Sequence, residues 1–285
     1  TSIPVTFGSP SGEPNPAEII VEGGKFGESN TNLKGGNEVA LGDDGGRGKV
    51  TVKGGAFHCS KFSISGNTAP ESNGYIDFLR IEGGAAYLRQ AYNYSTATAR
   101  VMVAGGTYYS AHQWYGAMFQ KGPFLFEREG ATITINRENT VKTLVTNDAS
   151  LRFTGASPVT IMGNGKAQSP CCVLGTNVWF DNVGKVKFSG NEKAELSGAH
   201  FGLEVTEILF DNSPQSVFSS ANSTTVIPCD LTFTNNAYLY GAGTLAFNTT
   251  SGDHVFSGPI HGTDLTMRKL GANTLTVSST TNIPH

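Results

Sequence analysis

The feature that most restricts the fold of this chain is a short pattern that recurs along its first half. A run of alternating apolar residues is followed by Gly-Gly and then by an aromatic or apolar residue. The first glycines of the doublets lie at positions 23, 54, 83 and 105, at intervals of 31, 29 and 22 residues. Repeats of roughly 20 to 50 residues are typical of solenoids and related arrays. The four segments are IIVEGGKF (19–26), VTVKGGAF (50–57), LRIEGGAAYL (79–88) and VMVAGGTYY (101–109).

The second half of the chain repeats in a different style. LRF (151–153) and VWF (178–180) are separated by 27 residues, and VTI (159–161) and VKF (186–188) by the same interval. No segment of convincing length has the 3.6-residue period of a helix, and the chain contains 36 glycines and only 15% charged residues. The series continues with ILFDN (208–212), LTFTNN (231–236), LAFNTT (245–250), LTM (265–267) and LTV (275–277).

These patterns predict a single all-β domain over residues 1–285, a right-handed parallel β-helix (β-solenoid) of roughly ten irregular coils. Coils of this kind stack about 4.8 Å apart, so equivalent residues lie over one another. The glycine doublets then form corners with positive φ, and Asn67 takes a left-handed conformation. Residues 1–18 are expected to form a looser N-terminal lead and residues 110–122 an insertion loop. A β-sandwich is the alternative, because it too consists of many short strands.

Several short motifs resemble a family of bacterial surface proteins. The motifs GGAF (54–57), GGAA (83–86), ISGN (64–67), FSGN (188–191) and FTNN (233–236) resemble the paired GGA-hydrophobic and Phe-x-x-Asn repeats of chlamydial-type polymorphic membrane proteins. Residues 254–279 are similar to the autotransporter-associated β-strand repeat. GGTYY and GGKF depart from the GGA form.

This resemblance touches roughly half of the chain. It implies that the chain is part of a longer autotransporter, a passenger exported through the outer membrane of a bacterium to its surface or beyond. A passenger of this type is a β-helical adhesin for a host glycan or protein, or a stalk.

The densest aromatic segment of the chain is the predicted binding surface. Its tyrosines and tryptophan fall within 24 residues, and such side chains stack on sugar rings or anchor protein partners. The other interpretation is that these rings only cover the core. The candidate residues are Tyr92, Tyr94, Tyr108, Tyr109, Trp114 and Tyr115.

Four aspartates support an alternative function as a polysaccharide lyase or glycosidase, because such enzymes need converging acidic groups. WFDN (179–182) and LFDN (209–212) are 30 residues apart, so Asp181 and Asp211 are expected on adjacent coils, although stacked Asp-Asn corners are also an ordinary structural feature. The sequence favours a non-enzymatic adhesin-like module over an enzyme, and a passive spacer is the third hypothesis. The other two candidate acids are Asp77 and Asp148.

Other chemistry has less support in the sequence. Asp43 and Asp44 are weak calcium candidates in a glycine-rich loop, and a solvated turn is the alternative. No cofactor motif or zinc spacing occurs. The net charge of −3 without a basic run argues against nucleic acid, and no apolar run approaches the roughly 20 residues of a membrane helix. Cys59 is expected to be buried, and one disulfide is expected between the pair Cys171–Cys172 and Cys229.

Overall fold

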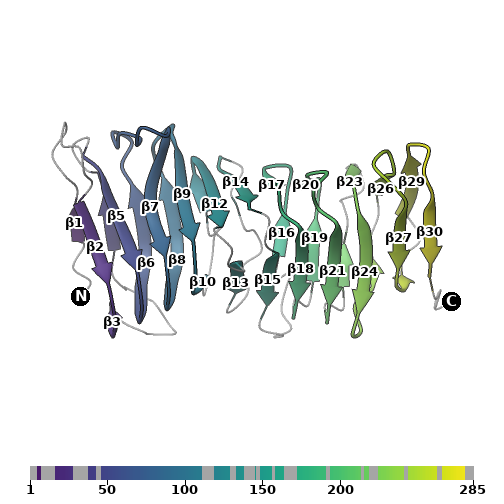
Figure 1. The fold of residues 1–285 in the computed structure, drawn as a ribbon, viewed down its shortest axis with the longest axis horizontal. Helices are drawn as coiled ribbons and strands as arrows, with labels where there is room; N and C mark the ends of the chain where they lie inside the picture. The colour runs from purple at the N-terminus through teal and green to yellow at the C-terminus, as the bar shows by residue number, and fades with distance from the viewer. Residues whose placement is uncertain are drawn as a thin grey trace.

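The computed structural model describes most of the chain as an elongated stack of parallel strands (Figure 1). Among the described residues every sheet is parallel and no helix is present. A β-sandwich consists of antiparallel sheets, so the predicted parallel β-helix is confirmed and the sandwich is excluded. The described ranges are 5–7, 17–27, 38–42, 46–110, 119–128, 133–137, 145, 148–155, 158–163, 172–190, 193–212, 215–217, 224–240, 243–261 and 265–279.

The largest sheet runs the full length of the stack. Its strands are β1 (Val5–Phe7), β3 (Lys25–Phe26), β4 (Glu38–Leu41), β6 (Ala56–Ile64), β8 (Ala85–Asn93), β10 (Thr107–Ser110), β11 (Phe119–Lys121), β13 (Ile133–Arg137), β15 (Val159–Gly163), β18 (Lys185–Ser189), β21 (Glu207–Asp211), β24 (Asp230–Thr234), β27 (His254–Ser257) and β30 (Leu275–Ser278).

The second side of each coil is a sheet of eight strands followed by a shorter sheet of three. The eight are β2 (Ala17–Val21), β5 (Gly48–Val52), β7 (Tyr75–Ile81), β9 (Thr98–Val103), β12 (Pro123–Arg128), β14 (Ser150–Thr154), β17 (Val178–Phe180) and β20 (His200–Phe201). The three are β23 (Thr224–Ile227), β26 (Gly243–Asn248) and β29 (Leu265–Leu270). The stack has about eight coils, slightly fewer than the roughly ten expected.

A third side completes the coil. In the first half it belongs to the large sheet, because β6 bends: its start pairs Ala56 with Lys25 of β3, and its end pairs Lys61 with Glu38 of β4. In the second half a separate five-stranded sheet takes this place. Its strands are β16 (Cys172–Leu174), β19 (Lys193–Leu196), β22 (Gln215–Val217), β25 (Leu239–Tyr240) and β28 (Ile260–His261).

Columns of stacked phenylalanine rings run through parts of the core. Phe153, Phe180 and Phe201 stack on three successive coils at centroid distances of 5.0 and 5.1 Å, with ring planes 8° and 4° apart. Burying one such ring contributes about 1.5 to 3 kcal/mol, so each coil needs its neighbours to cover this face. A second column in the large sheet consists of Phe188, Phe210 and Phe233.

The glycine doublets form the predicted corners. The second glycine of each doublet is left-handed, with φ of 69° at Gly24, 71° at Gly55, 67° at Gly84 and 73° at Gly106. Successive corners stack directly, because the nitrogen of Ala85 donates to the oxygen of Gly55 at 2.9 Å. A Cβ on Gly84 would lie 2.3 Å from that same oxygen. Only glycine therefore fits this corner.

Parts of the expected N-terminal lead and of the expected insertion are strands. Residues 5–7 form β1, which pairs with β4, and residues 119–121 form β11, which pairs with β8. Residues 111–118 lie outside the described part of the chain. Asn67 is not left-handed; the left-handed asparagines are Asn182, Asn212, Asn235 and Asn236.

The predicted disulfide is also corrected. Cys229 is a free, buried thiol, so it does not form the expected disulfide. Cys59 is buried as predicted, and burial raises the pKa of its thiol to about 12.

We predict that the corner stack makes Gly84→Ala far more destabilising than Gly24→Ala. Both glycines are left-handed, but a Cβ on Gly24 would meet nothing within 4 Å. Gly24→Ala should then cost about 1 kcal/mol of backbone strain, and Gly84→Ala about 3 kcal/mol from strain plus the clash. Urea unfolding of the two variants measures the difference. Equal losses would show that the stacked carbonyl does not set the glycine requirement.

Candidate functional site

The structure separates the predicted aromatic surface into buried and exposed parts. Tyr108 is 1% exposed and its ring packs edge-on against Phe126, so it cannot meet an external ligand. Burial raises the pKa of this phenol. Strand alternation explains the correction, because neighbours in a strand face opposite sides and only one of Tyr108 and Tyr109 can point outward. Trp114 and Tyr115 lie outside the described residues.

Tyr109 belongs to an aromatic column on the outside of the large sheet. His58 and Tyr87 stack at 4.4 Å, and Tyr87 and Tyr109 stack at 4.6 Å, with ring planes within 6° of parallel. A sugar ring needs an open aromatic face for stacking. Tyr87 has a ring on each face and Tyr109 has one face covered by Tyr87, so the column stabilises the sheet and offers little open aromatic surface.

Tyr92 and Tyr94 form a separate pair at a centroid distance of 5.9 Å. Tyr94 is 50% exposed, and the ammonium group of Lys61 lies 5.7 Å from the Tyr92 ring centroid. The adjacent Lys121 binds Asp148 at 2.9 Å, which together with the nearby tyrosines raises the pKa of Lys121. This pair remains an exposed candidate from the predicted set.

Each of the four candidate aspartates is held in an ion pair between coils. Asp77 binds Arg100, Asp148 binds Lys121, Asp181 binds Arg152 and Asp211 binds Lys187, at N–O distances of 2.5, 2.9, 2.6 and 2.7 Å. Lys187 and the Asn235 amide hold the pKa of Asp211 below its usual value. A general acid needs the opposite shift, so Asp211 is poorly suited to that role.

The expected stacking of Asp181 on Asp211 is wrong. Asp181 directly follows β17 on the second side, whereas Asp211 ends β21 in the large sheet. Both precede a left-handed asparagine, Asn182 or Asn212. The shared Phe-Asp-Asn motif therefore forms the same kind of corner on different sides of the coil.

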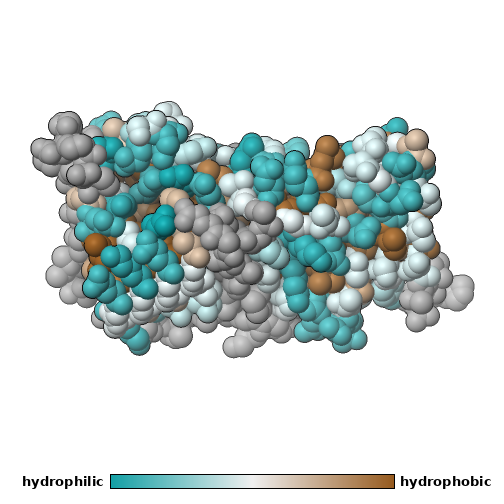
Figure 2. All heavy atoms as spheres, viewed as in Figure 1, coloured by the Kyte–Doolittle hydropathy of each residue, from teal (hydrophilic) through white to brown (hydrophobic). Residues whose placement is uncertain are grey.

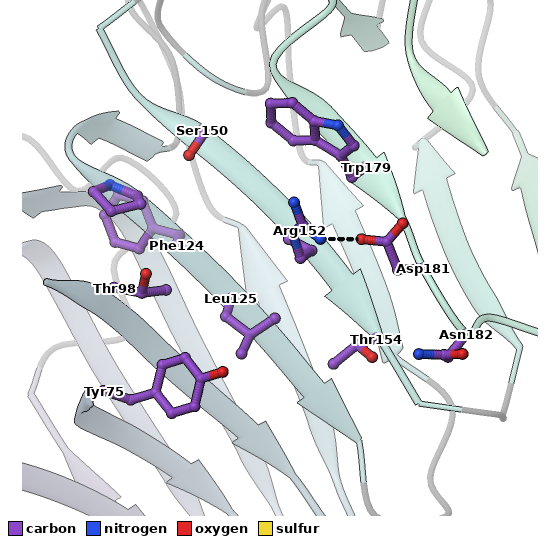
Figure 3. Close-up of a pocket in the computed structure, with 11 residues that line it drawn as sticks. Tyr75, Thr98, Phe124, Leu125, Ser150, Arg152, Thr154, Trp179, Asp181 and Asn182 are labelled. Atoms are coloured by element: carbon purple, nitrogen blue, oxygen red, sulfur yellow. Dashed lines mark hydrogen bonds and ion pairs between the residues drawn. The ribbon is translucent and has the colours of Figure 1, made fainter. Parts of the chain in front are cut away.

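Among the described residues, a groove on the outer surface of the second side is well suited to ligand binding (Figure 3). Its volume is about 450 Å³, within the range of ligand sites. Tyr75 and Trp179 lie near its two ends with Leu125 between them, and the Tyr75 hydroxyl points toward the middle (Figure 3). The remaining lining residues are Thr98, Pro123, Phe124, Ser150, Arg152, Thr154, Asp181 and Asn182.

The groove exists because short side chains occupy equivalent positions on successive coils. Thr98 pairs with Tyr75 in the preceding coil, and Pro123 pairs with Ser150 in the following one. In the neighbouring row Leu125 lies between Arg100 and Arg152, whose side chains reach further from the sheet. Small residues flanked by longer ones leave a hollow that runs along the stack.

The end of the groove beside Trp179 is a fixed polar cluster. The guanidinium carbon of Arg152 lies 5.5 Å from the Trp179 ring centroid, and its Nη1 donates to Asp181 at 2.6 Å. His200 stacks on Trp179 at 5.2 Å and 6°. Because Arg152 and His200 cover the two indole faces, the indole presents its edge to a ligand.

A second charged cluster borders the other end. Arg100 donates two hydrogen bonds to Asp77, at 2.5 and 2.6 Å, and one to Glu127 at 2.8 Å. The two carboxylates raise the pKa of Arg100, whose side chain is only 12% exposed. The guanidinium carbon of Arg100 lies 5.1 Å from the centroid of the Tyr75 ring.

Sequence reasoning missed this groove. It singled out Asp181 as a possible acid, but not Trp179, Tyr75 or Arg152. The available signal was the spacing of 27 residues that places VWF (178–180) over LRF (151–153), because it pairs Trp179 with Arg152. The hollow itself depends on which short residues lie side by side, and unequal loops conceal that from the sequence.

The remaining surface offers fewer candidates. In the view of Figure 2, hydrophobic residues form small separate spots on a mainly polar surface. No group of three potential metal ligands occurs among the described residues, and Asp43 and Asp44 lie outside them. A search of the described part finds no helix suited to crossing a membrane. No family model, curated protein or solved structure matches the chain.

We predict that Arg100→Met destabilises the fold by about 2 kcal/mol at pH 7. It leaves Asp77 and Glu127 half-buried without their counter-charge, and a fully buried case would cost about 3 to 5 kcal/mol. Urea unfolding of this variant and of the unmodified chain at pH 7 measures the loss.

Lys185→Met is the matched control for that prediction. Lys185 also pairs with a carboxylate between coils, Glu207 at 3.0 Å, but its side chain is 58% exposed. Exposed pairs contribute about 0 to 1 kcal/mol. If both variants lose the same stability, the Arg100 cluster is no more than a surface ion pair.

Proposed function

We propose that this chain is a non-enzymatic, adhesin-like β-helical module that binds a host glycan through the groove between Tyr75 and Trp179. The observation that carries the proposal is the composition of that groove. It combines an apolar floor at Leu125, the edge of the Trp179 ring and paired hydrogen-bonding groups within about 450 Å³. Sugar-binding sites need the same combination, because a sugar presents both C–H surfaces and hydroxyls.

The stacked coils suit the role of a stiff support. Continuous columns of buried phenylalanine resist bending, and binding residues on such a support keep their relative positions. The resemblance of GGAF (54–57) and FTNN (233–236) to passenger repeats supports a place on a bacterial surface or in the secreted fraction. In this proposal the chain is the exported part of a longer autotransporter and holds its groove away from the cell.

The groove favours binding over catalysis. Of the four candidate aspartates, Asp181 alone lines it, and Arg152 neutralises that carboxylate. A glycosidase of the usual kind needs two carboxyl groups on either side of the scissile bond, about 5 to 10 Å apart. A passive spacer needs no groove, so substitutions in the groove would leave the function of a spacer unchanged.

We predict that a glycan array detects binding and that Trp179→Ala weakens it by about tenfold or more, the loss of roughly 1.4 kcal/mol. Ser150→Tyr should also abolish binding, because the ring fills the groove without removing any native contact of Trp179. Tyr94→Ala is the control, since Tyr94 is exposed but absent from the groove lining. Unfolding curves of each variant separate lost binding from lost folding.

The same samples test the alternatives. New reducing ends that disappear in Asp181→Asn would make the chain an enzyme and overturn the non-enzymatic proposal. A loss of binding in Tyr94→Ala with none in Ser150→Tyr would transfer the site to the Tyr92–Tyr94 pair. An array without any bound glycan would favour the passive spacer.

A further inference from the structure

We infer that the groove selects an uncharged oligosaccharide that lies along the long axis of the stack and spans several coils. This inference rests on the proposed function and names the class of glycan that the site takes. Three properties of the groove support it: its charge balance, the orientation of its polar groups and its length.

The charge balance disfavours an acidic sugar. Arg152 is the one cation among the described lining residues, and Asp181 already neutralises it. The bordering cluster of Arg100, Asp77 and Glu127 carries a net charge of −1. A carboxylate or sulfate bound here would lose its hydration without gaining an unpaired cation, which is a net cost.

The polar groups suit sugar hydroxyls instead. A hydroxyl both donates and accepts, and it binds best where a fixed donor lies beside a fixed acceptor. The ion pair of Arg152 and Asp181 provides both within 2.6 Å, and the stacking of Arg152 on Trp179 restricts its rotation. The hydroxyls of Ser150 and Thr154 border the same space. Leu125 offers the apolar surface on which the C–H face of a sugar can pack.

The length of the groove favours a chain of several sugar units. Its lining residues come from five successive strands, β7, β9, β12, β14 and the β17 region. Four intervals between coils at about 4.8 Å make a site about 19 Å long. A single sugar would occupy only a part of it.

The backbone argues against an extended peptide as the occupant. Peptides that bind to sheets usually add a strand at an open edge, where unpaired N–H and C=O groups are available. The central strand of the groove, β12, is paired with β9 on one side and β14 on the other. The floor therefore offers side chains only, which suits a saccharide better than a peptide backbone.

The test uses an array that carries the same oligosaccharides in neutral, sialylated and sulfated forms, followed by calorimetry with the strongest ligand. We expect the neutral form to bind about tenfold more tightly than its charged counterparts, equal to about 1.4 kcal/mol. We expect affinity to rise with length and then level off. Its Kd should change less than about twofold between about 0.1 and 1 M NaCl, over which the screening length falls from about 10 to 3 Å.

Two variants connect the preference to the groove. Asp181→Asn keeps the shape of the groove and removes the charge that neutralises Arg152. The variant should therefore bind the sialylated oligosaccharide more tightly, relative to the neutral form, than the unmodified chain does. Ser150→Tyr should abolish binding of the neutral form. If Ser150→Tyr leaves this binding unchanged, the site lies elsewhere and the inference fails.

The remaining outcomes separate the inference from the function on which it rests. Tighter, salt-sensitive binding of the sialylated or sulfated form would overturn the uncharged ligand while leaving glycan binding intact. Preference for a single sugar without a gain from length would overturn the axial arrangement. Binding of a peptide in place of every glycan, or of no glycan, would overturn both the inference and the proposed function.

Discussion

The structure depends on the direct, in-register stacking of one coil on the next. At the corners this stacking brings backbone so close to backbone that a Cβ on Gly55 would lie 2.3 Å from the oxygen of Gly24, and a Cβ on Gly84 equally close to that of Gly55. Once the corners coincide, most strand positions between them have a counterpart on the neighbouring coils. Columns of phenylalanine inside and ladders of charged or aromatic residues outside follow from that single constraint.

The same constraint explains how a binding groove can form on a regular surface. In a stack of coils the height of the outer surface at each point is set by one side chain per coil. The short Thr98, Pro123 and Ser150 therefore lower the surface over three consecutive coils, while Arg152 and Trp179 keep it high beside them. Most of this site is built on strands without an interruption of the sheet, so its shape can change without a change in the fold.

The repeats predicted the fold well because the corner is a local feature. Gly-Gly doublets state directly where the chain must turn, and the structure places a left-handed glycine at each of the four. The groove was not predictable in the same way. Its residues come from different coils separated by unequal loops, and a bulge between Asp77 and Leu79 shifts the register of β7. Local density of aromatic residues instead pointed to Tyr108, which alternation turns into the core.

Pairing between coils also changes the meaning of the acidic residues. An aspartate on such a sheet lies about 4.8 Å from a residue on each neighbouring coil, close enough for a direct ion pair whenever that residue is basic. Asp77, Asp181 and Asp211 all have such partners, so their charge serves cohesion between coils. The pair at Arg152 has a second consequence, because it is the one that borders a groove. This ion pair places a hydrogen-bond donor beside an acceptor, an arrangement that can orient a sugar hydroxyl.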